Sequence, residues 1–378
     1  MSTPSFLDVL EEISTEIVQP SAAAVDADAT FPRAAIDALG ERGLLGLLSA
    51  PEVGGMGLGL AEAAQVVRRL AADCASTAMV VTMHYSAVTV IEAHGPETVR
   101  RAVAEGRHLS TLAFSESGSR SHFWAPLGTA TAKGDQVVLE ASKSWVTAAS
   151  EADSYVWTSR PTTGVDGATL WLVPTGTDGL EIAGGFDGLG LRGNDSRPVR
   201  ATDVTLPADA VLGADGAGLD IALGVVLPLF QVCNASCSLG LMDATIAKTV
   251  AHMTTTRFEH LDETLADQPV ARQHLAAMKN RADQASTLVD DAVDALTTGR
   301  ADAPLRMLQS KAVAGDAAIE VCDIAMRLGG GAAFRKDIGM ERHFRDARAS
   351  AVMAPTADAL GDFVGRAVSG LPLFGSAA

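Results

Sequence analysis

Apolar residues recur every three or four positions through the first hundred residues, which is the period of an amphipathic helix. Phe31 and Pro32 begin one predicted helix, and Gly43 stands just past its end. This agrees with the preference for Pro at the first helical turn and for Gly after the last. Residues 61–71 predict a longer helix. Residues 77–93 are apolar on nearly every face, so we expect a helix that is buried on most sides.

The pattern changes near residue 110. Alternating and β-branched runs separated by Gly, Pro, Asp and Asn predict strands at residues 111–114, 136–140, 155–158, 169–173 and 199–204. From about residue 216 the helical period returns, with interruptions near residues 262–269, 298–304 and 329–331. We therefore predict an α+β protein with a helical domain at 1–109, an antiparallel β domain at 110–213 and a helical domain at 214–378.

The composition limits the partners that the protein can have. The 378 residues carry a formal net charge of -17, and no run of Lys or Arg is long enough to bind a phosphate backbone, so nucleic acid and anionic membranes are poor partners. The N-terminus has no basic region followed by an apolar run, and the apolar stretch 221–229 is too short to span a bilayer. Cys233 and Cys237 lie four residues apart with no His or second Cys pair at zinc spacing, so we expect buried thiols, no metal site and a cytoplasmic location.

Several common enzyme classes are not expected, because the sequence lacks the motifs that are typical of them. The glycine-rich loop GGMGLGL and the three consecutive glycines at 329–331 do not follow a strand within a βαβ unit, and no Gly-Lys-Ser/Thr follows them. The chain has no Gly-x-Ser-x-Gly and no His-Glu-x-x-His. A nicotinamide enzyme, a nucleoside triphosphatase, a serine hydrolase of the usual kind or a zinc protease is therefore not expected.

Two segments of the predicted β domain carry the candidate chemistry: LAFSESGSRSH at 112–122 and KSWVTAASEAD at 143–153. A flat aromatic side chain beside short hydroxyls suits an isoalloxazine ring, because the indole of Trp145 can cover one face while Ser115 and Thr147 reach its N and O atoms. Taken one by one, these residues also fit a core tryptophan and ordinary strand hydroxyls.

The same segments resemble the acyl-CoA dehydrogenase family. KSWVTAASEAD is similar to the pattern Lys-x-Trp-Ile-Thr-Asn-x-x-x-Ala-Asp, and FSESGSR to Thr-Glu-Pro-x-x-Gly-Ser-Asp, although Ser115, Ser117 and Arg120 depart from it. PEVGGMGLGL, LPADAVLG, IAMRLGGGAAF and MERHFRDAR resemble further motifs of the family, in order along nearly the whole chain. The resemblance implies a helical N-terminal domain, a central β-barrel domain and a C-terminal four-helix bundle.

The resemblance also implies partners and site residues. It implies FAD, an acyl-CoA or carrier-bound acyl thioester, an electron-transfer protein as acceptor, and a homotetramer or homodimer. The cofactor-binding positions it implies are Phe114, Ser115, Trp145, Thr147, Arg257, Arg327, Gly330 and Thr356. Arg257 matches a pyrophosphate-binding Arg but lacks the Phe-Gly that follows it in the family, and Arg327 stands in place of a Gln. The substrate-side positions are His84, Ser121 and His122, and His84 equally fits a core histidine.

The catalytic base of the family is missing. The family takes a Glu from Glu-Gly-Thr about nine residues after Arg-Asp-Ala, and the aligned residues here are Ala354, Pro355 and Thr356. A second location used in the family falls on Phe230. The catalytic base is therefore unassigned, and three hypotheses remain. A displaced carboxylate, either Asp358 or Asp220, could accept the proton; the protein could be a flavin-dependent monooxygenase; or it could be a non-catalytic acyl-CoA-binding partner subunit.

Overall fold

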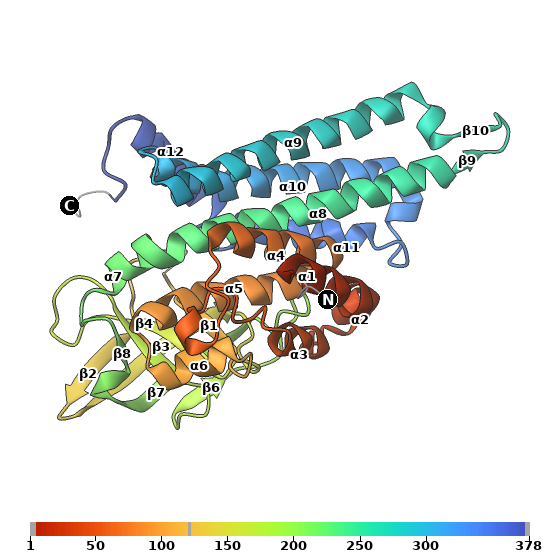
Figure 1. Ribbon diagram of the computed structural model, residues 1–378. Coiled ribbons are helices and arrows are strands. Elements are labelled where there is room, and N and C mark those ends of the chain that lie inside the picture. The colour runs from red at the N-terminus through yellow and green to blue at the C-terminus, as the bar shows by residue number, and fades with distance from the viewer. Residues whose placement is uncertain (1–4, 120–121, 375–378) are drawn as a thin grey trace. The chain divides into compact units, whose positions relative to one another are not determined.

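The computed structural model describes residues 5–119 and 122–374 and has helices first, strands second and helices again, which confirms the predicted α+β order (Figure 1). The chain forms two compact units. The helix–sheet unit comprises Met1–Val66, Ser76–Gly188 and Arg192–Phe230, and the bundle unit comprises Val67–Ala75, Leu189–Leu191 and Gln231–Ala378. The three-domain division at 109 and 213 stays a prediction, because compactness groups the N-terminal helices with the strands.

Helices occupy the N-terminal residues, as predicted. They are α1 (Phe6–Ile13), α2 (Gln19–Asp28), α3 (Arg33–Glu41), α4 (Leu60–Asp73), α5 (Ala75–His94) and α6 (Glu97–Ala104). Ser5 caps α1 by accepting a hydrogen bond from the backbone N–H of Asp8, whose carboxylate in turn accepts from the backbone N–H of Ser5. The continuous apolar sequence of α5 agrees with its burial along nearly its whole length.

The strands form two four-stranded sheets among the described residues. One sheet has the order β1 (Ser110–Ala113), β4 (Ser154–Ser159), β5 (Thr169–Pro174) and β8 (Val211–Leu212). The other has the order β2 (Thr129–Lys133), β3 (Gln136–Val146), β7 (Arg197–Pro207) and β6 (Leu180–Ile182). All pairs are antiparallel except β1 with β4, which is parallel because β2 and β3 lie in the connection between them. The antiparallel prediction therefore fails for this one pair.

Both faces of the first sheet are buried. One face packs on the other sheet around Tyr155, Trp157 and Leu139. The opposite face, which includes Val156 and Leu170, packs on α5. The candidate site residues on β3 and after β1 are thus attached to a rigid, apolar framework.

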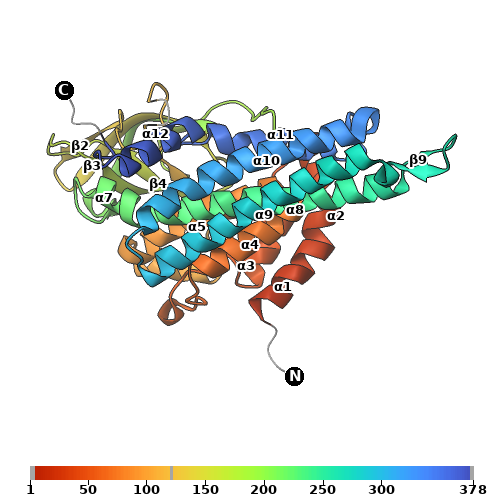
Figure 2. The same ribbon diagram turned by 90° about the horizontal axis from the view of Figure 1, so that it is seen from above.

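The bundle unit consists mainly of long helices. These are α8 (Leu227–Thr255), which begins at the end of the helix–sheet unit, α9 (Pro269–Thr298), α10 (Ala303–Ala333), α11 (Met340–Val352) and α12 (Ala357–Val368). Helices α8, α9 and α10 run side by side in both views (Figures 1 and 2). A short hairpin of β9 (Arg257–Phe258) and β10 (Glu263–Thr264) joins α8 to α9.

One long apolar helical run deserves comparison with a membrane span. Gly218–Thr255 comprises α7 (Gly218–Ile221), a π-helical turn (Ala222–Val226) and α8, and by length and composition it could cross a membrane. Of its most apolar window, 72% is buried inside the fold, as is usual for a core helix. Cys233 and Cys237 lie in this run and are buried thiols, as predicted.

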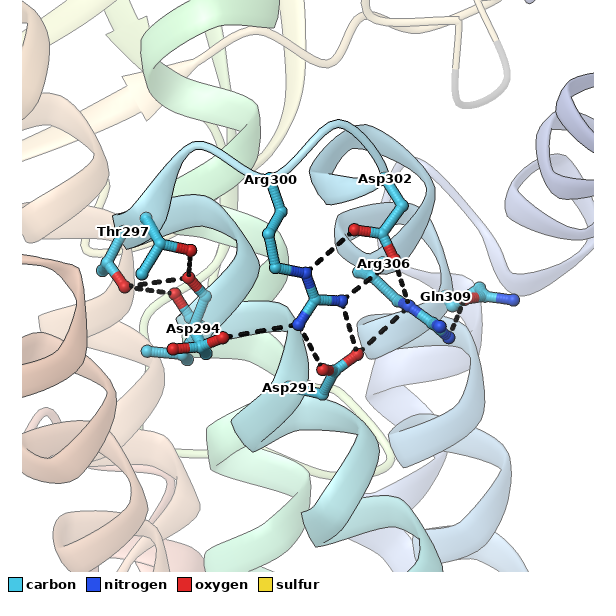
Figure 3. A network of polar contacts seen from close by, with 9 residues as sticks. Asp291, Asp294, Thr297, Arg300, Asp302, Arg306 and Gln309 are labelled. Atoms are coloured by element: carbon cyan, nitrogen blue, oxygen red, sulfur yellow. Dashed lines mark hydrogen bonds and ion pairs between the residues drawn. The ribbon is translucent and has the colours of Figure 1, made fainter.

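The turn between α9 and α10 is closed by an ion-pair network (Figure 3). Arg300 contacts Asp291 at 2.6 Å and Asp302 at 2.9 Å, and Arg306 bonds the same two carboxylates at 3.1 and 3.0 Å. Each of these side chains is partly exposed, so each single pair contributes little to stability. Together they fix the turn and the relative positions of the two longest helices of the bundle unit.

Candidate functional site

A buried ion pair joins the two candidate segments of the β domain. The Lys143 ammonium lies 2.7 Å from Glu116 Oε1 and also donates to the carbonyl and hydroxyl of Thr158, each at 2.7 Å. Glu116 also accepts from the backbone N–H groups of Leu127 and Gly128. Burial lowers the pKa of Lys143 to about 8, and the neighbouring Glu116 opposes that shift. The pair therefore links the segment after β1 to β3.

Trp145 is presented outward by a β-bulge. The register of β3 against β7 shifts between Lys143 and Val146, and Trp145 has a positive φ of 57°. Such a backbone is an outlier for a bulky residue, and bulges often re-aim a side chain next to a functional site. The indole is 70% exposed and makes a T-shaped contact with Phe186, at 6.3 Å between ring centroids. The structure therefore places a flat aromatic face where a planar ligand can stack.

The other predicted flavin contacts of the β domain lie beside this bulge. The Ser115 carbonyl accepts from the Ser144 N–H at 2.9 Å, and the Ser115 hydroxyl has no hydrogen bond to another described residue. The Thr147 hydroxyl is buried 3.3 Å from the hydroxyl of Ser196. Phe114 is half-buried and packs on the apolar cluster against α5. The fold thus brings all four predicted β-domain positions together.

His84 is held by backbone groups on both ring nitrogens. Nδ1 accepts from the N–H of Ser110 at 3.1 Å, so Nε2 carries the proton and donates to the carbonyl of Leu45 at 3.1 Å. The ring is fully buried, and burial lowers its pKa to about 4. These are the contacts of a core histidine that stays neutral. Its assignment to the substrate side remains a prediction.

The buried His84 makes the protein sensitive to acid. Its ordinary pKa of 6.5 falls to about 4 on folding, so between these values the unfolded chain binds more protons than the folded one. The contribution of the neutral His84 to the free energy of unfolding is fully present above pH 6.5. We expect roughly 3 kcal/mol of the free energy of unfolding to be lost as the pH falls toward 4. Urea unfolding at several pH values would measure this loss. His84→Gln, which can keep both backbone bonds, should reduce the slope. The exposed control His260→Gln should leave the pH dependence of the free energy of unfolding unchanged. If His84→Gln also leaves it unchanged, His84 is not the source of the acid sensitivity.

The remaining substrate-side predictions are only partly described. Ser121 lies outside the described residues. His122 is exposed, with its ring 4.8 Å from that of Trp124. Phe123 packs edge-on against the same indole at 5.2 Å. The segment after Glu116 thus carries an aromatic group whose use by a ligand stays a prediction.

The predicted cofactor positions of the bundle unit lie at separate points. Arg257 starts the β9–β10 hairpin and pairs with Asp262. Arg327 is exposed near the end of α10 and forms no ion pair with another described residue. Gly330 has φ 51° and ψ −136° and kinks α10, in agreement with the predicted interruption. A Cβ at Gly330 would meet nothing within 4 Å, so backbone conformation rather than crowding favours glycine there.

The turn where the family places its base has no carboxylate. Ala354 and Pro355 lie between α11 and α12, and Thr356 caps α12 by accepting from the N–H of Ala359 at 3.3 Å. Asp358 is exposed in the first turn of α12. Among the described residues 353–356, none carries an acidic side chain.

A buried lysine that the sequence reasoning missed holds this turn. The Lys311 ammonium donates to the carbonyls of Ser350, Met353 and Pro355 at 2.8, 3.1 and 2.9 Å. Burial lowers its pKa to about 7. Its position on the apolar face of a predicted helix, in a run otherwise rich in Ala and Met, was the available signal. Lys143 and Glu116 stand in the two candidate segments, but the sequence did not predict that they form an ion pair.

Comparison with known proteins gives a consistent match along the chain. Three family models match in order: acyl-CoA dehydrogenase N-terminal domain at residues 4–106, middle domain at 111–204 and C-terminal domain at 216–369. Cyclohex-1-ene-1-carbonyl-CoA dehydrogenase of Geobacter metallireducens is 28% identical over 375 residues and covers 96% of both chains. Human mitochondrial short-chain specific acyl-CoA dehydrogenase is 27% identical over 371 residues, covering 93% of this chain and 86% of its own.

Solved structures share the fold. Butyryl-CoA dehydrogenase from Megasphaera elsdenii superposes with a TM-score of 0.89 at 23% identity, covering 98% of this chain and all of its own. A structure from work on the electron transferring flavoprotein of Acidaminococcus fermentans has a TM-score of 0.90 at 25% identity and covers 96% of both chains. These likenesses confirm the predicted arrangement of a helical domain, a β domain and a helical bundle.

Proposed function

Because the chain belongs to the acyl-CoA dehydrogenase family, we propose that it is an FAD-dependent oxidoreductase that oxidises the Cα–Cβ bond of an acyl thioester. The thioester is an acyl-CoA or an acyl group on a carrier. The exposed Trp145 at the β-bulge is the observation that carries this proposal. A bulky side chain in a left-handed backbone conformation, with most of its ring in solvent, is explained by a planar ligand that stacks on it.

The residues of the β domain fit a flavin. The indole of Trp145 offers a face, and the unbonded hydroxyl of Ser115 offers a donor and an acceptor on the neighbouring segment. The Lys143–Glu116 pair fixes the spacing of the two segments. Bound FAD would supply the two-electron acceptor that takes a hydride from Cβ. The role of the chain is to stack the ring, bond its edge and accept the proton from Cα.

The proton acceptor is proposed to be Asp358. The usual position is Ala354, and Asp358 lies four residues on, in the first turn of α12. A carboxylate can accept a proton as a general base, which the alanine at position 354 cannot. Asp220 is the alternative displaced carboxylate, at the start of α7.

The function is tested by reconstituting purified protein with FAD and titrating it anaerobically with a panel of acyl-CoA esters. We expect a yellow protein whose visible band bleaches with at least one ester. Trp145→Ala should bind FAD about tenfold more weakly, because a stacking contact is lost, while the exposed control Val165→Ala should bind it normally. Protein that never takes up flavin would end the proposal.

The second candidate function is a flavin-dependent monooxygenase of the same fold. The observation in its favour is the turn 353–356, which carries no carboxylate; oxygen insertion by reduced flavin needs no acceptor for an α-proton. Colour that persists with every acyl-CoA, together with oxygen uptake when a flavin reductase is supplied, would support it. Colourless protein that binds CoA esters would instead support a non-catalytic partner subunit.

The remaining partners follow from the family. We propose a homo-oligomer, a tetramer or dimer, that passes electrons to an electron-transferring flavoprotein, and a cytoplasmic location. Gel filtration with light scattering tests the assembly. Reoxidation of the bleached protein by a purified electron-transferring flavoprotein tests the acceptor.

A further inference from the structure

Helices α8 and α11 run antiparallel, and their contacts define a register. The Thr245 hydroxyl lies 3.0 Å from Nδ1 of His343. Further toward the start of α8, Asn234 accepts from the hydroxyl of Ser350 at 2.9 Å and contacts the sulfur of Met353 at 3.3 Å. As residue numbers fall along α8, their partners rise along α11.

Continuing this register leads from Asn234 to Gln231 in the direction of the turn that contains Ala354. Gln231 lies three residues before Asn234, which is about 4.5 Å further along the helix axis and on a neighbouring part of the same face. The next chain segment in that direction is 353–356. The register therefore directs the part of α8 around Gln231 toward the turn where the family keeps its base.

The Gln231 side chain is fully buried, yet neither its Nε2 nor its Oε1 atom has a hydrogen-bond partner among the described residues. Buried side-chain amides are nearly always bonded, so an unmet donor and acceptor together call for a specific explanation. The amide belongs to no interaction that the fold itself needs.

The polar groups of the neighbouring turn are already used. The Lys311 ammonium donates hydrogen bonds to the carbonyls of Ser350, Met353 and Pro355. The hydroxyl of Ser350 donates to the side-chain carbonyl of Asn234. These carbonyls and this hydroxyl are therefore bonded to α10 and α8, whereas the buried amide of Gln231 has no partner among the described residues.

We propose that Gln231 binds a hydroxyl substituent of the acyl group, so that the preferred substrate is a hydroxyacyl thioester. This inference rests on the proposed function, which puts the reacting carbons beside position 354. The amide offers N–H donors on Nε2 and an acceptor on Oε1, and a hydroxyl group can both accept from the first and donate to the second. A plain alkyl chain would leave both atoms unpaired, and sites built to bond a polar group reject analogues that lack it.

Binding of thioether analogues to the FAD-loaded protein tests this inference without turnover, because a CoA thioether has no acidic α-proton. Calorimetry would compare S-butyl-CoA with three forms that carry a hydroxyl on the second, third or fourth carbon. We expect at least one hydroxylated form to bind about 10–100-fold more tightly than S-butyl-CoA. Gln231→Leu should abolish this preference and should not lower the melting temperature, since it removes an unpaired polar group.

The control is Thr249→Val, which removes a buried hydroxyl of α8 that is already bonded to Thr245 within its own helix; it should keep the preference. Should Gln231→Leu fail to fold, Gln231→Met serves in its place. Equal binding of all four analogues by the wild type, or a preference unchanged in the variant, overturns the inference. If the hydroxylated analogues bind selectively but no acyl-CoA bleaches the flavin, the role of Gln231 in binding is supported and the dehydrogenase proposal is contradicted.

Discussion

Lys143→Met is expected to lower the free energy of unfolding by about 3–5 kcal/mol, because it leaves the buried carboxylate of Glu116 without its cation. The two side chains are almost fully buried and 2.7 Å apart. The loss should appear in urea unfolding, and FAD uptake should fall with it, since the pair holds Ser115 and Trp145 on adjacent segments. This contact is the tightest link between the two candidate segments.

The double variant Glu116→Gln with Lys143→Met separates charge from packing. It leaves no charge buried, and the Gln can still accept from the N–H of Gly128, so at least half of the lost stability should return. Lys133→Met, on the exposed end of β2, is the matched control and should change little. A single Lys143→Met variant as stable as the wild type would contradict the assignment of this pair as a structural tie.

The order of elements could be predicted because each long element repeats one period many times. The apolar helix at 77–93 became α5, and the alternation at 136–140 became the first half of β3. Strands β2 and β6 were missed because they are short and mostly exposed, so they show no clear alternation of apolar and polar residues. The second half of β3 was missed because a bulge breaks its period.

Sequence reasoning could propose candidate site residues where they are neighbours in the chain, but it could not find contacts that the fold makes between distant residues. Trp145 and Thr147 were proposed together because they lie on one segment, and their contact with a flavin stays a prediction. The partnership of Lys143 with Glu116 spans 27 positions, and sequence spacing gives no sign of it. The same holds for Lys311, whose three acceptors lie about 40 positions further on. The positive φ of Trp145 is likewise a product of register, which a single sequence does not reveal.

Position 354 shows why a residue substitution alone leaves the chemistry open. The alignment places Ala354 at the usual base position, but whether a carboxylate reaches the same point depends on the path of the turn into α12. Hydrogen bonds from Lys311 on α10 and Asn234 on α8 fix that path, and Thr356 caps the start of α12. The position of Asp358 is therefore determined by residues that lie far from it in the sequence.

Asp358→Asn is expected to slow anaerobic reduction of the bound flavin by about 10²–10⁴-fold, because the amide cannot accept the α-proton. The rate is measured by stopped-flow bleaching with the acyl-CoA that reduces the wild type fastest.

Asp362→Asn is the matched control: it lies one turn further along α12, pairs with Arg366 at 2.7 Å and should leave the rate unchanged. Ala354→Glu introduced into Asp358→Asn should restore much of the rate by returning a carboxylate to the usual position. An unchanged rate of flavin reduction in Asp358→Asn would remove Asp358 as the base. If the rate falls as expected, failure of Ala354→Glu to restore it would show that the turn does not lie within reach of the reacting carbon.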